Sequence, residues 1–171
     1  MPERAWIEGQ ICFLERHEIT SKLIAGLEGH WTKVRGDRAM PRRDEIDPVE
    51  LVQWLPYLSI TELHYDPFRV RYRVVGTEVV RIVGEDFSHR WLDETGWGEA
   101  SMALNSLLYK RVAERRAPVF GLSVLPWQGK PEHVFQWALF PLGDGKTVTH
   151  CLSLDDLSLI EPRSWLLPLG M

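Results

Sequence analysis

Apolar residues recur at steps of three and four between residues 15 and 34, with charged side chains between them. In an α-helix this spacing gathers the apolar side chains on one face. The residues at these positions are Ile19, Leu23, Ile24, Leu27, Trp31 and Val34. We therefore expect an amphipathic helix over residues 15–34 that ends near Gly36.

Three more helices are expected farther along the chain. The run Asp47-Pro48-Val49-Glu50 predicts a short helix that ends at Pro56, because aspartate caps a first turn and proline suits the first helical position. Residues 76–84 form a short helical stretch. A second apolar stripe over residues 99–116 predicts a longer helix, which Pro118 closes.

The clearest strand pattern lies over residues 68–75, where apolar and basic side chains alternate. Successive side chains of a strand point to opposite faces, so one face should be apolar and the other basic. The apolar set is Phe68, Val70, Tyr72 and Val74, and the basic set is Arg69, Arg71 and Arg73. Further strands are predicted over residues 57–63, 119–125, 133–140 and 147–154, with a hairpin at Gly143-Asp144-Gly145.

Two strands, then helices, then three strands predict an α+β fold with a five-stranded antiparallel sheet. The helices should gather on one face of the sheet, and the N-terminal amphipathic helix can cover the other. We divide the chain into an N-terminal helical extension (1–36), one α+β domain (37–160) and a C-terminal tail (161–171).

Length and charge narrow the classes of function. A chain of 171 residues fits a single domain, and a net charge of -4 gives no general attraction for nucleic acid or for anionic lipid. No apolar run is long enough to span a bilayer, so we expect a cytoplasmic protein. Cys12 and Cys151 lack the spacing of a zinc site, and we expect no metal and no disulfide.

A series of short motifs runs through the middle of the chain. In order they are Trp31, Pro41-Arg42, Asp47-Pro48, Leu55-Pro56, Tyr72-Arg73, Gly76-Thr77, Gly84-Glu85-Asp86-Phe87 and Pro141-Leu142. By their order and spacing these motifs resemble the PAS superfamily, and within it a bacterial family in which a PAS-like fold makes up nearly the whole protein. The resemblance implies a non-catalytic sensory or adaptor module in bacterial signalling, which binds a small molecule, a protein partner, or both.

The resemblance also implies a cavity between the sheet and the central helices that holds haem, flavin, a small metabolite or nothing. Haem-binding PAS domains usually supply a histidine from the helix before the last three strands, and residues 99–116 contain none. His89 lies in the preceding loop. Neither cysteine is placed for photoactive flavin chemistry. We therefore expect no cofactor.

Five residues are candidates for the wall of such a cavity or for its polar anchors: Tyr72, Trp91, Tyr109, Trp137 and His150. Each has an ordinary alternative, because tryptophans commonly fill a core and a buried histidine can be satisfied by a backbone carbonyl. For contact with a protein partner, a second copy of the chain included, the candidates are Leu23, Leu27, Trp31 and Arg73.

Two other classes of function stay open. A small enzyme could use a tyrosine, a histidine and an aspartate in the cavity. The candidate catalytic residues for it would be His64, Asp66, Tyr72 and His150. The arginine stripe of residues 69–73 could instead meet nucleic acid, which we do not expect at this net charge. The arginines at 35, 38, 42 and 43 stand among acidic residues and predict a loop that pairs with itself.

Overall fold

The computed structural model describes residues 4–125 and 134–160, and within them the chain forms one antiparallel sheet with three α-helices. The strand order is β1-β4-β5-β6-β2-β3. The strands are β1 (Ile11–Leu14), β2 (Leu58–His64), β3 (Arg69–Val75), β4 (Val119–Val124), β5 (Val134–Gly143) and β6 (Val148–Asp155). The predicted α+β class is confirmed, and the sheet has six strands where five were expected.

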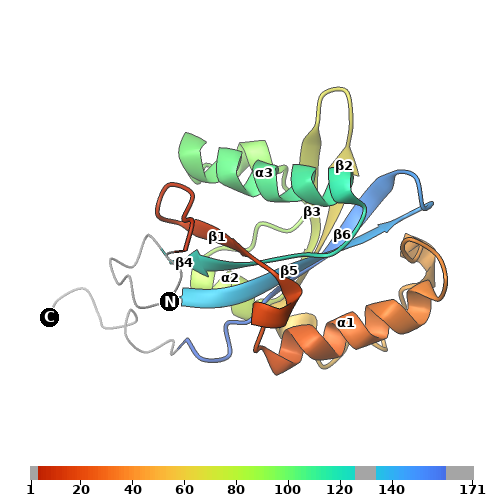
Figure 1. Ribbon diagram of the computed structural model, residues 1–171. Coiled ribbons are helices and arrows are strands. Elements are labelled where there is room, and N and C mark those ends of the chain that lie inside the picture. Colours follow the sequence, from red (N-terminus) through yellow and green to blue (C-terminus); the bar gives the residue numbers. More distant parts are fainter. Residues whose placement is uncertain (1–3, 126–133, 161–171) are drawn as a thin grey trace, which may run out of the picture.

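The helices lie on both faces of the sheet (Figure 1). They are α1 (Lys22–Arg35), α2 (Thr77–Val83) and α3 (Glu99–Arg115). The helix α3 packs against β3, β4, β5 and β6, whereas α1 packs against β5 from the opposite side. No helix within the described residues is long and apolar enough to cross a membrane.

The strand absent from the sequence prediction is β1, which pairs with β4 from Ile11 opposite Ser123 to Leu14 opposite Phe120. Its four residues, Ile-Cys-Phe-Leu, show no alternation, and a short apolar run carries no period that marks a strand. The predicted 15–34 helix also begins later, at Lys22. Ser21 caps α1, since its Oγ accepts a hydrogen bond from the Ile24 N–H at 3.1 Å.

The helix predicted after Asp47 is wrong, because residues 48–54 form consecutive turns with no α-helix. Asp47 does accept a hydrogen bond, from the Val49 N–H at 2.9 Å, but this contact closes a local turn. Pro56 leaves too few residues for a helix to propagate, since an isolated first turn is costly.

A β-bulge changes the predicted faces of β3. Ile60 pairs with Val74 and Thr61 with Tyr72, so Arg73 is an extra residue on this strand. Val74 therefore lies on the face opposite Tyr72, and it is 41% exposed. The prediction that Val74 shares a buried face with Tyr72 is wrong for this reason, whereas Val70 and Tyr72 are both buried.

The helix α1 is fixed to the sheet by its apolar stripe. Ile24, Leu27 and Trp31 are buried, and the Trp31 indole N–H donates to the Pro141 carbonyl at 2.9 Å. The rings of Trp31 and Phe140 lie 5.9 Å apart between centroids. Phe140, Leu152 and Leu154 therefore face α1, and the alternate residues of the same strands face α3.

Candidate functional site

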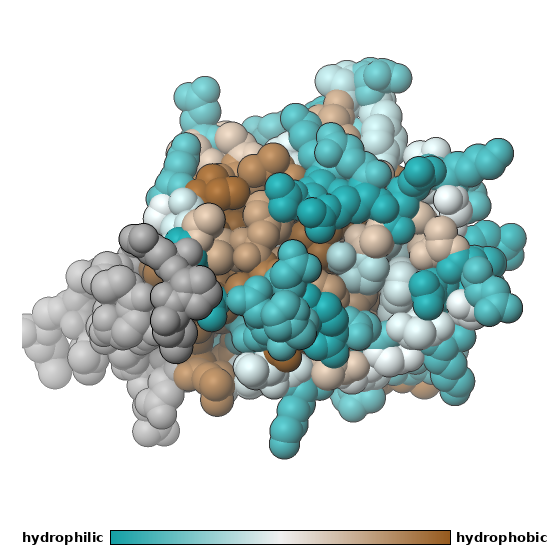
Figure 2. All heavy atoms as spheres, viewed as in Figure 1, coloured by the Kyte–Doolittle hydropathy of each residue, from teal (hydrophilic) through white to brown (hydrophobic). Residues whose placement is uncertain are grey.

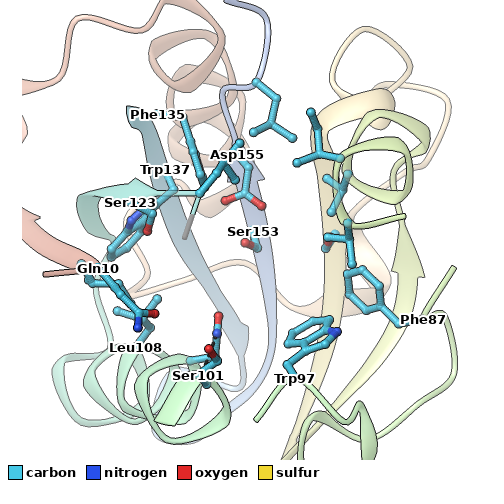
Figure 3. A pocket seen from close by; sticks show the side chains of 18 of the residues that line it. Gln10, Phe87, Trp97, Ser101, Leu108, Ser123, Phe135, Trp137, Ser153 and Asp155 are labelled. Atoms are coloured by element: carbon cyan, nitrogen blue, oxygen red, sulfur yellow. Dashed lines mark hydrogen bonds between the residues drawn. The ribbon is translucent and has the colours of Figure 1, made fainter. Parts of the chain in front are cut away.

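A cavity of about 540 Å³ lies between the sheet and helices α2 and α3. Its volume falls in the ~300–1,000 Å³ range of small-molecule sites. Val79 and Ile82 of α2, Leu108 of α3 and Leu139 of β5 supply apolar wall. Gln10 and Ile11 also line the cavity, so the segment that forms β1 closes one end (Figure 3).

Aromatic side chains make up much of the remaining wall. Among the described residues, the aromatic side chains of the lining are Tyr72, Phe87, Trp97, Tyr109, Phe135 and Trp137. Three of them form an edge-to-face cluster: Phe87 lies 4.7 Å from Tyr72 and 4.8 Å from Trp97 between ring centroids. Figure 3 shows Phe87 and Trp97 on one side of the cavity and Trp137 with Ser123 on the other.

Two buried phenols face each other across the cavity wall. Tyr72 comes from β3 and Tyr109 from α3, and each phenol influences the pKa of the other. Burial raises the pKa of Tyr72 and of Tyr109 well above the ordinary value. Both phenols are therefore neutral at physiological pH and can offer a donor and an acceptor to a ligand.

Asp155 is an acidic group of the cavity wall whose pKa lies far above its ordinary value. It ends β6, opposite Trp137 of β5, and it points into the cavity (Figure 3). Burial raises the pKa of Asp155 to about 7, because a carboxylate loses its hydration in this wall. The side chain is therefore present in both protonation states near pH 7.

Small polar side chains complete the wall. Ser59 of β2 and Ser153 of β6 are paired neighbours, both nearly buried on the cavity face. Ser101 and Asn105 come from α3, where the Asn105 side chain donates to the Ser101 carbonyl at 2.9 Å. The indole N–H groups of Trp97 and Trp137 are buried and have no acceptor among the described residues.

The charged side chains of the wall are acidic. Asp155 and Glu85 line the cavity, and no lysine, arginine or histidine within residues 4–125 and 134–160 does so. The described lining therefore favours a neutral or positively charged guest over an anion.

Of the five predicted ligand residues, the structure brings Tyr72, Tyr109 and Trp137 together in the cavity wall. Trp91 lies outside it, with the Arg69 guanidinium 4.0 Å from its ring centroid and His64 packed against its edge at 4.9 Å. His150 lies on the α1 side of the sheet, beside Glu62 at 3.9 Å. Burial lowers the pKa of His150.

Sequence reasoning missed Asp155, Trp97 and Phe87. The strand β6 has two faces, and Cys151 and Ser153 share the cavity side with Asp155, whereas His150 shares the other with Leu152. The same alternation was visible in the sequence, but Asp155-Asp156 resembles the polar start of a turn. Trp97 and Phe87 lie in an irregular segment without a period, so no pattern assigned them a face, although Phe87 belongs to the Gly84-Glu85-Asp86-Phe87 motif.

The predicted interface residues of α1 are largely covered by the chain itself. Leu27 and Trp31 are buried against the sheet, and Leu23 is half-buried. Arg73 lies at the surface near Glu62, with 3.6 Å between the charged groups. A partner that met α1 would therefore contact the other, polar side of the helix.

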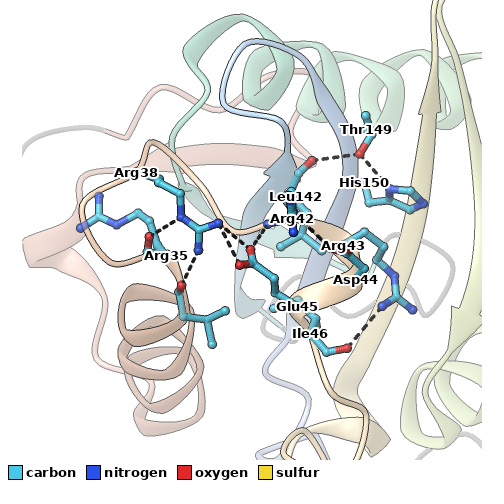
Figure 4. A network of polar contacts seen from close by, with 11 residues as sticks. Arg35, Arg38, Arg42, Arg43, Asp44, Glu45, Ile46, Leu142, Thr149 and His150 are labelled. Carbon is cyan, nitrogen blue, oxygen red and sulfur yellow. Dashed lines mark hydrogen bonds and ion pairs between the residues drawn. The ribbon is translucent and has the colours of Figure 1, made fainter.

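Several arginines of the two basic segments have acidic partners within the described residues. Arg38 pairs with Glu45 at 2.7 Å and Arg42 with Asp44 at 3.3 Å (Figure 4). In the β3 stripe, Arg69 forms a bidentate pair with Asp93 at 2.7 Å. These contacts agree with the expected self-paired loop, and they neutralise much of the charge that a polyanion would need.

Apolar side chains also reach the surface (Figure 2), on the face that Figure 1 shows, in the area of β1 and β4 between α3 and α1. Phe13 of β1 and Leu122 of β4 are half-buried. The Arg111 guanidinium of α3 covers the Phe13 ring at 3.7 Å from its centroid, and Phe13 in turn meets Trp137 edge-on at 6.0 Å. Phe13, Gly121 and Trp137 are aligned across β1, β4 and β5, so Phe13 packs beside Trp137 on the same face of the sheet as the cavity.

A family model described as a PAS domain matches residues 19–147, which is most of the chain. The match includes β2, β3, α2, α3, β4 and β5, and these elements carry most of the cavity wall. No curated protein and no solved structure gives a significant match.

Proposed function

Because the chain belongs to the PAS domain family, a class of sensory and signalling modules, we propose that it senses a small molecule bound in the cavity between the sheet and helices α2 and α3. The observation that carries this proposal is the composition of the cavity wall. An apolar cavity with a few buried polar groups is the usual form of a small-molecule site. Tyr72, Tyr109 and Asp155 are those polar groups here.

The half-buried Asp155 carboxyl supports a binding role over mere packing. A polar group in an apolar wall costs free energy unless it has a partner, and a core needs no aspartate for its stability. Ser59, Ser153 and Asn105 add further hydrogen-bonding capacity to the same wall. A ligand that forms hydrogen bonds with these groups would offset that free energy. Their positions would determine which ligands fit.

The proposed output is contact with another protein, which makes the chain a bacterial signalling adaptor without chemistry of its own. A second copy of the chain is one such partner. The candidate surfaces for such a partner are the edge strands β1 and β3 and the polar side of α1. The paired arginines argue against nucleic acid as the partner.

A small enzyme is the second candidate, and a specific observation favours it. Three groups with raised pKa values, those of Asp155, Tyr72 and Tyr109, converge on one cavity, and such clusters are typical of catalytic sites. Of the residues first suggested for an enzyme, only Tyr72 lines this cavity. Turnover of a bound compound would separate this candidate from a sensor, which returns its ligand unchanged.

Native mass spectrometry and an absorption spectrum of the purified chain test the binding proposal directly. We expect a retained small molecule, or a compound from a metabolite library that raises the melting temperature. Ser153→Phe, which fills the cavity from β6, should abolish binding, whereas Thr149→Phe on the exposed part of β6 should not. If no compound binds the wild-type chain in either measurement, the proposal fails.

A further inference from the structure

We propose that the cavity binds a small organic cation, a protonated amine or a quaternary ammonium, with Asp155 as its counter-ion and aromatic side chains as its wall. This inference rests on the proposed function and names the chemical class of its ligand.

The position of Asp155 is the first argument. Its carboxyl group projects from the end of β6 into the cavity, with Ser153 on the same strand face and Trp137 opposite on β5 (Figure 3). Asp155 is half-buried, and a carboxylate in a mostly apolar wall is stabilised by an opposite charge close by. The described lining contains no basic side chain, and the proposal assigns the opposite charge to the ligand.

The aromatic wall is the second argument. Six rings of the described residues line a cavity that also holds a carboxyl group, and aromatic faces attract cations through their quadrupole. Rings joined to one carboxylate are the usual means of binding ammonium groups, because they offer negative potential without the hydration that a second carboxylate would keep.

The titratable groups that face Asp155 from the described elements are neutral or acidic. Tyr72 faces it from β3 and Tyr109 from α3, and both phenols feel its charge. Cys151 lies below it on β6, and burial keeps its thiol protonated by raising its pKa. Glu85, at the end of α2, adds a second acidic group to the wall.

Binding of a cation should then displace a proton. Burial holds the pKa of Asp155 at about 7 in the free chain, and a cation beside the carboxylate favours its ionised form. The neutral acid loses its proton to solvent as the ion pair forms. Affinity should therefore increase from about pH 6 to about pH 8, with proton release most evident below pH 7.

Titration calorimetry of the full chain tests this inference with matched probes. The cations are choline, tetramethylammonium and n-butylammonium. The neutral probe is 3,3-dimethyl-1-butanol, which has the shape of choline without its charge, and the anion is butyrate. We expect at least one cation to bind about tenfold or more tightly than the neutral probe at pH 8, with weaker binding at pH 6.

Two variants locate the effect. Asp155→Asn keeps the shape of the side chain and should weaken the cation about tenfold or more at pH 8 while removing the pH dependence. Asp156→Asn is the matched control, because the Asp156 carboxylate contacts Ser21 at 2.5 Å on the α1 side. It should leave cation affinity unchanged. Titrations in two buffers of different ionisation enthalpy report proton release in the wild-type chain, whatever the variants do.

The outcomes separate this inference from the proposed function. If the neutral probe or butyrate binds as tightly as every cation, or if binding does not depend on Asp155, the cation inference is overturned while a ligand cavity stands. If the library compounds and all the probes fail to bind, both proposals fall together.

Discussion

At the residue scale, Asp155 links stability to pH. Its pKa is about 7 in the folded chain, above the ordinary 3.8, so the folded state holds this proton more tightly than the unfolded state does. The stabilisation is present in full below about pH 4 and is lost as pH rises through about 7. The free energy of unfolding should therefore decrease across this window.

Asp155→Asn should remove that decrease. We expect the variant to be more stable than the wild-type chain at pH 8, by on the order of 1–4 kcal/mol, and similar to it near pH 4. Urea denaturation at several pH values measures the difference. A wild-type chain whose stability does not fall between pH 4 and pH 8 relative to the variant would contradict the raised pKa.

Gly121 is the residue that makes room for the cavity wall. It pairs with Trp137 across β4 and β5, and a Cβ at Gly121 would overlap the Trp137 ring and lie 2.6 Å from the Cys12 carbonyl oxygen. Gly121→Ala should cost about 1–3 kcal/mol of stability, because a rigid ring and a neighbouring strand must both shift.

Gly29→Ala is the control for that change. Gly29 lies in α1 with nothing within 4 Å of an added Cβ, so alanine should stabilise the helix by about 0.5–1 kcal/mol. Thermal melts of both variants give the comparison. Equal changes in melting temperature for the two variants would show that the contact with Trp137 does not contribute to stability.

At the element scale, the Trp31 side chain joins α1 to the sheet by a hydrogen bond within an apolar contact. Trp31→Phe removes the N–H that meets the Pro141 carbonyl, whereas Trp97→Phe removes an N–H that has no acceptor among the described residues. Trp31→Phe should therefore cost about 1–2 kcal/mol more than Trp97→Phe. Chemical denaturation of the two variants checks this, and a larger loss for Trp97→Phe would contradict it.

The same elements show what the sequence could predict. Long periodic segments were found, since α3 and strands β2 to β6 follow their predicted ranges within a few residues. The strand β1 was missed, because four apolar residues in a row fit helix, strand or loop equally. The bulge at Arg73 was also missed, since a register shift depends on pairing with β2 and not on the strand's own pattern.

The candidate site was half predictable for a related reason. Tyr72, Tyr109 and Trp137 stand in regular elements whose alternation or stripe assigns them a face, and all three line the cavity. Phe87 and Trp97 stand in irregular backbone, where no period assigns a face. The predicted tail, residues 161–171, lies outside the described residues.

At the scale of the whole molecule, the central strands β5, β6 and β2 support two cores at once. One face of these strands holds α1 through Phe140 and Trp31, and the other forms the cavity with α3. Side chains from the two faces alternate along the same backbone, so neither layer can separate without loss of hydrogen bonds that the other needs. The two layers should therefore unfold in one cooperative transition.

Near-ultraviolet and far-ultraviolet circular dichroism measure this coupling in a single denaturation. The near-ultraviolet signal reports the aromatic packing, much of it around the cavity, and the far-ultraviolet signal reports helix and sheet. We expect both midpoints to coincide in the wild-type chain and to decrease together in Trp31→Phe, although Trp31 lies on the face remote from the cavity. If Trp31→Phe lowered the far-ultraviolet midpoint and left the near-ultraviolet one unchanged, α1 would be a separate unit. A ligand in the cavity could then influence α1 only through contacts other than those of the shared strands.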